Sequence, residues 1–283
     1  MKQRLVFALL IVLLAVTACT PQATPTVAPT AVPPTETSVP PTATAVPRTL
    51  TVFAAASLTG SFKEIGTAFE AANPGVTVTF NFAGSQALRT QIEQGAAADV
   101  FASASHKDMD TLVGENLAPS GYKDFVTNLL IVILPPKNPG NVQTLADLAK
   151  PGLKLILEDK SVPAGAYSLQ ILDNMSKDPT YGTDFSKNVL ANVVSNETDV
   201  KQVVSKVDMG EGDAGIVYVT DAIAAPDLKT IDIPANYNVI AKYPIAVLSK
   251  APNADLAAAF VAFVQSDNGQ AIMKKWGFSP VKP

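Results

Sequence analysis

Two serines stand where predicted strands give way to helices, and small residues precede both. Ser57 closes the run AAAS, and Ser85 follows Gly84. A serine at a helix start can cap its own helix, or it can offer its hydroxyl and backbone N–H to a ligand. Helix N-termini carry a partial charge of about +0.5 and bind anions directly. Because small side chains leave the backbone accessible, the pair indicates an anion site, with helix capping as the alternative.

A second pattern bears on the first of these serines. Ser61 and Glu64 have the spacing of a capping box, in which the two side chains satisfy the first N–H groups of a helix. This pattern predicts that the helix after the first strand is capped at Ser61. Ser57 is then not needed as a cap and remains available to a ligand.

Catalytic chemistry has few candidate side chains. His106 is the only histidine and lies at a predicted helix start, where we expect a solvated surface role. Glu158 and Asp159 are adjacent on a predicted strand and point to opposite faces, so we expect two solvated strand-end charges. Neither a nucleophile elbow nor a nucleotide-binding glycine loop occurs. We therefore predict no enzyme, no catalytic residue, no cofactor and no metal-cation site, with a lipoprotein hydrolase as the weaker alternative.

The N-terminal segment bears on location. Lys2 and Arg4 precede an apolar run from Leu5 to Val16, which is shorter than the roughly 20 residues of a membrane span and is typical of a secretory signal. The sequence VTAC, which ends at Cys19, resembles a bacterial lipobox. We predict a lipoprotein signal peptide over 1–18 and lipidation of Cys19, which anchors the protein to the outside of the cell membrane. An ordinary signal peptide with an incidental cysteine is the alternative.

The segment 19–47 consists, from Thr20 on, almost entirely of Pro, Thr, Ala, Val and Ser, with too few large apolar side chains to offset the entropy of ordering. We predict an extended linker there, and a surface adhesion module with a stalk is a second class that fits this composition. The formal net charge is −4, and no basic cluster with interleaved aromatic residues occurs. Nucleic acid is therefore not an expected partner.

Strands and helices alternate through the remaining chain. Leu50–Ala55, Val76–Phe82 and Val100–Ala102 are predicted strands with helical patterns between them, and the alternation restarts after the apolar run Asn128–Pro136. This order predicts an α/β fold with two lobes, each with a mixed, mostly parallel sheet covered by helices on both faces, and a ligand cleft between the lobes. The predicted boundaries are 48–127 and 243–283 for lobe 1 and 128–242 for lobe 2.

Four segments in order resemble the molybdate-binding proteins of bacterial ABC importers. They are VFAAASLTGSFKEI, NFAGSQALRTQIEQGAAADVFASAS, VPAGAYS and GEGDAGIVYVTDA, and the likeness continues to YPIAVL and KKWGFSP near the C-terminus. The resemblance implies the two-lobed type II periplasmic binding protein fold. It also implies a monomer that captures molybdate, and tungstate as a close co-ligand, and docks on a membrane permease driven by an ATPase.

The family's oxyanion ligands fall on five positions of this chain. The resemblance implies that Ser57 and Ser85 each offer a hydroxyl and a backbone N–H, that Ala164 and Val200 offer backbone N–H alone, and that Tyr218 offers its phenol. Without the resemblance, Ala164 is a turn residue, Val200 a helix-core residue and Tyr218 a half-buried strand aromatic. Molybdenum would be bound only as the oxyanion, with no direct ligand to the metal.

The chemistry of these five positions suits a fully deprotonated dianion. Molybdate carries no proton at neutral pH, so its receptor needs donors only, whereas hydrogen phosphate also needs an acceptor carboxylate. None of the five residues is acidic, which argues against phosphate. None is Arg or Lys, so neutral dipoles would carry recognition. A receptor for sulfate, thiosulfate or another tetrahedral oxyanion remains the alternative function.

Overall fold

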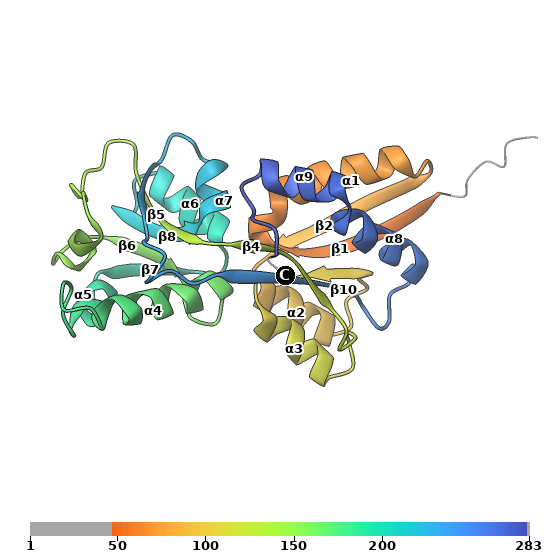
Figure 1. The fold of residues 1–283 in the computed structure, drawn as a ribbon, viewed down its shortest axis with the longest axis horizontal. Coiled ribbons are helices and arrows are strands. Elements are labelled where there is room, and N and C mark those ends of the chain that lie inside the picture. The colour runs from red at the N-terminus through yellow and green to blue at the C-terminus, as the bar shows by residue number, and fades with distance from the viewer. Residues whose placement is uncertain (1–46, 282–283) are drawn as a thin grey trace, which may run out of the picture. The chain divides into compact units, whose positions relative to one another are not determined.

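The computed structural model describes residues 47–281, whose strands form two five-stranded sheets (Figure 1). All these residues belong to one unit of the chain. The predicted signal peptide 1–18, Cys19 and the predicted linker up to Val46 lie outside the described residues. No helix within residues 47–281 combines the length and apolar character needed to cross a bilayer.

The first sheet has three parallel strands and two strands from later in the chain. Its members are β1 (Arg48–Ala55), β2 (Val76–Ala83), β3 (Val100–Ala102), β4 (Lys123–Asn128) and β10 (Ala241–Val247). The order is β2-β1-β3-β10-β4, in which β1, β2 and β3 run parallel and β10 runs antiparallel to both of its neighbours. Leu50, Val52 and Phe53 are all buried, because helices cover both faces of this sheet.

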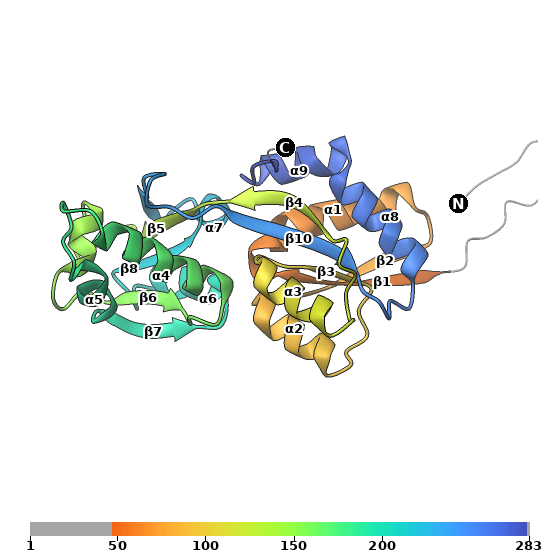
Figure 2. The same ribbon diagram turned by 60° about the horizontal axis from the view of Figure 1, so that its bottom comes forward.

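Helices pack on the two faces of the first sheet as separate groups (Figures 1 and 2). They are α1 (Thr59–Ala72), α2 (Ser85–Glu93), α3 (His106–Gly114), α8 (Ala254–Gln265) and α9 (Asp267–Lys275), and a short 3-10 helix, η1 (Ala56–Leu58), joins β1 to α1. On one face, Phe260 of α8 makes edge-to-face contacts with Phe62 and Phe69 of α1. On the other face, α2 and α3 bury Leu88 and Met109 in a second apolar cluster.

The second sheet repeats this plan with the next part of the chain. Its strands are β5 (Leu130–Leu134), β6 (Leu155–Glu158), β7 (Val193–Glu197), β8 (Ala214–Tyr218) and β9 (Lys229–Asp232), in the order β7-β6-β8-β5-β9. β7, β6 and β8 run parallel, and β5 runs antiparallel to β8 and β9. Its helices are η2 (Leu145–Ala149), α4 (Pro163–Ser176), α5 (Phe185–Leu190), α6 (Val200–Asp208) and α7 (Val219–Ile223). Figure 1 shows α6 and α4 on opposite faces of the sheet.

We call each sheet with its helices a lobe. The chain passes from the first lobe to the second through Leu129 alone, between β4 and β5, and returns between β9 and β10. The predicted fold class, two mixed and mostly parallel sheets with helices on both faces, is confirmed. The lobe limits at 128 and 243 remain predictions.

Candidate functional site

The two serine-containing helix starts lie at one edge of the first sheet. β1 and β2 run parallel, and Ala55 and Ala83, the last residues of these strands, pair in register. η1 then carries Ser57, and α2 begins at Ser85. Both serines are buried. The repeat in the sequence therefore corresponds to two neighbouring turns at the carboxyl ends of parallel strands, where open α/β sheets bind ligands.

Ser57 is held by an aromatic hydroxyl from the far end of the chain. Its Oγ lies 2.9 Å from the hydroxyl of Tyr243, which is fully buried in β10. No side chain among residues 47–281 caps η1 or α1. Ser57 is therefore not a helix cap. If the Tyr243 hydroxyl donates to Ser57, the serine keeps its own proton for another acceptor.

The capping box predicted at Ser61 is wrong. α1 already begins at Thr59, so Ser61 lies inside the first turn and donates its hydroxyl proton back to the Leu58 carbonyl oxygen over 3.1 Å. Glu64 turns outward and accepts from Lys275 Nζ over 2.9 Å. A local capping pattern was overridden because η1 runs directly into α1. Ser57 is free of a capping role, although not for the reason that the sequence suggested.

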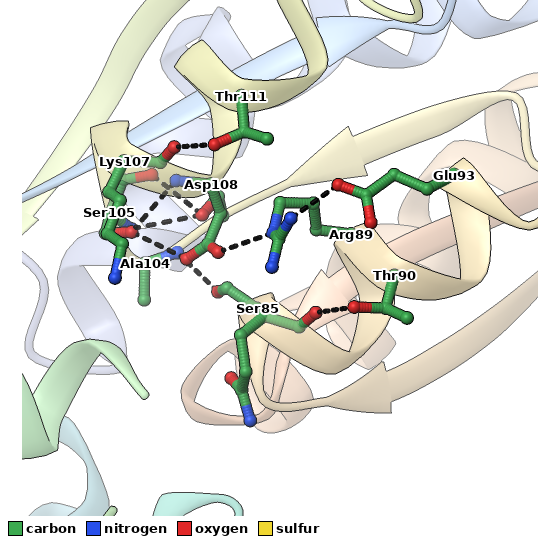
Figure 3. Close-up of polar contacts among 11 residues, drawn as sticks. Ser85, Arg89, Thr90, Glu93, Ala104, Ser105, Lys107, Asp108 and Thr111 are labelled. Carbon is green, nitrogen blue, oxygen red and sulfur yellow. Dashed lines mark hydrogen bonds and ion pairs between the residues drawn. The ribbon is translucent and has the colours of Figure 1, made fainter. Parts of the chain in front are cut away.

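Ser85 is fixed by the backbone of the loop after β3. The Ala104 N–H donates to Ser85 Oγ over 3.0 Å (Figure 3). The residue before the helix, Gly84, occupies the N-cap position, and no side chain of the described residues caps α2. Because the Ser85 oxygen accepts from Ala104, its hydroxyl proton remains available to an acceptor in the neighbouring cavity.

A buried polar network supports the loop that carries Ala104. The Ser105 hydroxyl donates to Asp108 Oδ2 over 2.8 Å, and Arg89 Nε donates to Asp108 Oδ1 over 3.2 Å (Figure 3). Arg89 also binds Glu93. Burial raises the pKa of Asp108, while Ser105 and Arg89 lower it. The network joins α2 to the start of α3 and so helps to fix the position of Ser85.

In the second lobe, α4 begins without a side-chain N-cap from its Val162 N-cap residue. Pro163 at the first helical position has no N–H, so the first donors of the helix are those of Ala164 and Gly165. Gly165 N donates to Glu158 Oε2 over 3.1 Å. The N–H groups of Gly165 and, to a smaller extent, Ala164 lower the pKa of Glu158, whose net shift is upward because of burial.

α6 presents one further backbone donor. Asp199 is the N-cap residue, and its side chain accepts from Lys201 N over 2.9 Å and from Gln202 N over 3.2 Å. The Val200 N–H, at the first helical position, has no backbone or side-chain acceptor within residues 47–281. A free N–H at a helix N-terminus is a favourable donor to an anion.

Tyr218 adds a hydroxyl at the end of β8. Its side chain is 2% exposed, and its hydroxyl oxygen has no hydrogen-bond partner in the described part of the chain. The ring packs against Tyr243 with centroids 5.7 Å apart. Burial raises the pKa of the Tyr218 phenol well above its usual value, so the group keeps its proton. A buried hydroxyl without a partner costs free energy, so a ligand at this place would recover a hydrogen bond.

A small cavity brings most of these groups together. Its volume is only about 10 Å³, counted as the space open to the centre of a water molecule, and Ser57, Ser85, Val200 and Tyr218 line it. The fifth predicted residue, Ala164, is buried and is not among the lining residues, although Val162 and Pro163 are. Donors from both sheets therefore face one space, with two hydroxyls from the first lobe and a hydroxyl and a helix N-terminus from the second.

The two lobes touch at the edges of this cavity. Gln86 Nε2 donates to the Thr198 carbonyl oxygen over 3.1 Å, and the Tyr167 hydroxyl donates to the Ala104 carbonyl oxygen over 3.3 Å. A Cβ atom on Gly84 would collide with the same Thr198 oxygen. The sequence suggested that Gly84 leaves room for a ligand. In the structure it leaves room for the opposite lobe.

Sequence reasoning was wrong about Glu158. This side chain is 5% exposed, lines the cavity and has its pKa raised to about 8, chiefly by burial. Asp199 lines the cavity as well. The five predicted ligands are not acidic, but the cavity as a whole contains two acidic residues. The one available signal was the position of Glu158, at a strand end five residues before a proline that starts a helix. Tyr243, which holds Ser57, carried no such signal.

The remaining chemical candidates stay outside the cavity. His106 begins α3 and is partly exposed, and its Nε2 lies 2.5 Å from Asp124 Oδ1, with which it forms an ion pair when protonated. Within residues 47–281, no cluster of three or more His, Cys, Asp or Glu side chains is arranged to hold a metal ion. Cys19 lies outside the described residues.

Comparison with known proteins gives a consistent result. The family model described as "Bacterial extracellular solute-binding protein" matches residues 50–279. The Molybdate-binding protein ModA of Mycobacterium tuberculosis strain H37Rv is 39% identical over 229 residues, which cover 81% of this chain and 83% of that protein.

Two solved structures share the fold. The periplasmic molybdate-binding protein of Azotobacter vinelandii superposes with a TM-score of 0.70 at 23% identity, covering 83% of this chain and 99% of that one. The sulfate-binding protein SubI of Mycobacterium tuberculosis superposes with a TM-score of 0.75 at 20% identity, covering 83% of this chain and 88% of that one. At these identities the likeness extends to the fold, and proteins that bind different oxyanions share it.

Proposed function

The chain belongs to the bacterial extracellular solute-binding proteins, and we propose that it captures molybdate, with tungstate as a close co-ligand, for an ABC importer. The choice of ion follows the 39% identity to a molybdate-binding protein over most of both chains. Capture and delivery of a solute need no chemical conversion of it, in keeping with a binding protein and not an enzyme.

The observation that carries an oxyanion site is the hydroxyl of Tyr218, which has no hydrogen-bond partner among the described residues. It is buried and lines one cavity with Ser57, Ser85 and Val200, whose N–H likewise has no acceptor within residues 47–281. We assign these four groups, with the Ala164 N–H, as the ligands of the oxyanion. Each hydrogen bond to a charged ligand is worth about 1.5–3 kcal/mol, so a handful offsets the cost of association and leaves micromolar to nanomolar affinity.

Ligand contacts from both lobes would favour the closed arrangement. Ser57 and Ser85 belong to the first lobe, and Val200 and Tyr218 to the second. An ion that binds all of them stabilises closure by its difference in affinity for the open and closed states. The two strand crossings near Leu129 and before Ala241 are the proposed hinge.

Delivery and location complete the proposal. The loaded, monomeric protein docks on a membrane permease driven by a cytoplasmic ATPase. Lipidation of Cys19, supported by the lipobox pattern VTAC, holds it on the outer side of the cell membrane, and residues 19–47 act as a linker. Palmitate labelling of the wild-type protein and of a Cys19→Ala variant in cells tests the anchor. Loss of the label in the variant is expected, and equal labelling would contradict lipidation at Cys19.

Isothermal titration with molybdate, tungstate, sulfate and phosphate tests the function. We expect molybdate and tungstate to bind one per chain at micromolar concentration or below, and sulfate and phosphate to bind far more weakly. Tight binding of sulfate with no heat from molybdate would transfer the assignment to a sulfate or thiosulfate receptor. No binding of any of the four ions would contradict the oxyanion site.

A further inference from the structure

The carboxyl group of Glu158 lies in the cavity that we assign to the oxyanion, where an ionised carboxylate would repel the bound ion. Glu158 is the last residue of β6, it lines the cavity, and its side chain is 5% exposed. Burial of an ionised carboxylate is unfavourable unless strong donors satisfy it. Hydrogen-bond donors next to Glu158 must therefore stabilise this carboxyl group.

Those donors are the first N–H groups of α4. Gly165 N donates to Glu158 Oε2 over 3.1 Å, and the Ala164 N–H, one residue earlier at the same helix start, also lowers the pKa of this carboxyl. Ala164 is the residue whose N–H we assign to the oxyanion. A Cβ atom on Gly165 would collide with the Asp159 carbonyl oxygen, so the glycine allows the start of α4 to lie against the end of β6. The close approach keeps the carboxyl beside the helix N-terminus.

The other charges around Glu158 oppose its ionisation. The ionisable groups on the elements packed against it are Asp199, Lys201, Tyr218, Asp221, Glu197 and Lys206. Both lysines bind other carboxylates of the described chain: Lys201 Nζ lies 2.8 Å from Asp221 Oδ1, and Lys206 Nζ lies 2.6 Å from Glu197 Oε1. Asp221 and Asp199 raise the pKa of Glu158 by charge repulsion, in addition to the larger effect of burial.

Resting on the proposed function, we propose that Glu158 is a specificity-determining residue of the oxyanion site. When Glu158 is ionised, its carboxylate accepts hydrogen bonds from the first N–H groups of α4. When a dianion binds the Ala164 N–H, the carboxylate takes up one proton from solvent and becomes neutral. That proton returns to solvent when the ion dissociates. A neutral carboxyl removes the repulsion that an ionised one would exert on the bound dianion.

The direction of the pH effect follows from this exchange. The pKa of Glu158 is raised to about 8, so below that pH the group is already neutral and binding needs no proton. Above it, binding requires the uptake of one proton, and the dissociation constant rises toward tenfold per pH unit. The site therefore favours fully deprotonated dianions at neutral and mildly acidic pH and weakens in alkali. An ionised Glu158 would instead help to bind an ion that carries a proton, such as hydrogen phosphate.

The test is isothermal titration of molybdate into the wild-type protein, Glu158→Gln and Asp159→Asn, from about pH 6.5 to about pH 9.5. Glutamine keeps the shape and removes the charge. Asp159→Asn is the matched control, because it removes a neighbouring charge that binds the Ser161 hydroxyl and N–H instead of the helix α4 donors. Titration in buffers of different ionisation enthalpy gives the number of protons taken up.

We expect wild type and Asp159→Asn to lose about tenfold affinity per pH unit above about pH 8 and to take up close to one proton per ion at pH 9. Glu158→Gln should show neither effect. Equal pH profiles for wild type and Glu158→Gln would overturn the proposal. Absence of molybdate binding in all three proteins would overturn the proposed function instead, and the same comparison with the ion that does bind would then decide the role of Glu158.

Discussion

The two lobes supply different kinds of donor to the same cavity. The first lobe offers the side-chain hydroxyls of Ser57 and Ser85, and each is fixed by a partner of its own, Tyr243 or the Ala104 N–H. The second lobe offers backbone N–H groups at the starts of α4 and α6, together with the Tyr218 hydroxyl, which has no partner among residues 47–281.

This difference decides what a substitution can do in each lobe. In the first lobe the residue type carries the donor, so truncation removes it. At the helix starts of the second lobe the backbone carries the donor, and the side chain contributes to packing, as Val200 does in the apolar core. The second lobe also contains a carboxyl group beside its donors, whereas the first-lobe hydroxyls bind neutral partners.

The largest expected effect concerns Glu158 in the absence of any ligand. Its pKa is raised from 4.5 to about 8 in the folded protein, so between these values the folded state holds a proton that the unfolded state has released. The free energy of unfolding of the wild type should therefore fall as pH rises from about 4.5 to 8, by up to about 5 kcal/mol, and then level off. Glu158→Gln should lack this slope. Urea unfolding at several pH values measures it, and parallel curves would contradict a buried, proton-holding Glu158.

Gly84→Ala should break the contact between the lobes. The added Cβ would collide with the Thr198 carbonyl oxygen, which belongs to the second lobe. We expect molybdate affinity to fall about 10- to 100-fold, as overpacking costs about 1–3 kcal/mol, with little change in the melting temperature of the ligand-free protein. Gly114→Ala is the matched control, because its Cβ would meet no atom of residues 47–281 within 4 Å. Equal affinities of the two variants would show that closure does not need Gly84.

Ser57→Ala and Ser85→Ala should each weaken molybdate binding by about 1–3 kcal/mol, because each removes a hydroxyl donor. Some loss of stability is also expected, since Ser85→Ala leaves the Ala104 N–H without its acceptor and Ser57→Ala frees the Tyr243 hydroxyl. Ser61→Ala serves as the control, as the buried Ser61 hydroxyl donates to the local Leu58 carbonyl oxygen. A lower melting temperature with unchanged affinity would make the two serines structural residues and not ligands.

The smallest effect on affinity is expected for Val200→Ala, in the second lobe. The loss of two buried methyl groups should lower the free energy of unfolding by about 1–3 kcal/mol. The backbone N–H remains, so molybdate affinity measured by titration should stay within about threefold of wild type. A loss as large as that of the serine variants would mean that the side chain, and not the backbone, determines binding at α6.

Much of the fold could be predicted from the sequence, because it is expressed in local patterns. Leu58, Phe62, Ile65 and Phe69 recur at helical spacing and are all buried in α1 or just before it. The alternation of strands and helices and its restart after Asn128 predicted two sheets, and two sheets are present.

The candidate site was less accessible to local patterns. The donors at Ala164 and Val200 are backbone groups, so only family resemblance could point to them. Glu158 is buried because α4 packs against the end of β6, and a local sequence pattern does not predict that contact. The prediction of a capping box at Ser61 was wrong because α1 already begins at Thr59. The packing of the fold, and not the four-residue pattern, determines where this helix begins.

Titration of molybdate into the wild-type protein and Tyr218→Phe tests the oxyanion site most directly. We predict that wild type binds one ion per chain and that the variant binds about 1–3 kcal/mol more weakly, because it lacks the donor. The ligand-free variant should be as stable as wild type or more stable, since the hydroxyl that it lacks has no hydrogen-bond partner within residues 47–281 of the wild-type protein. Equal affinity of the two proteins would mean that the ion does not bind in this cavity.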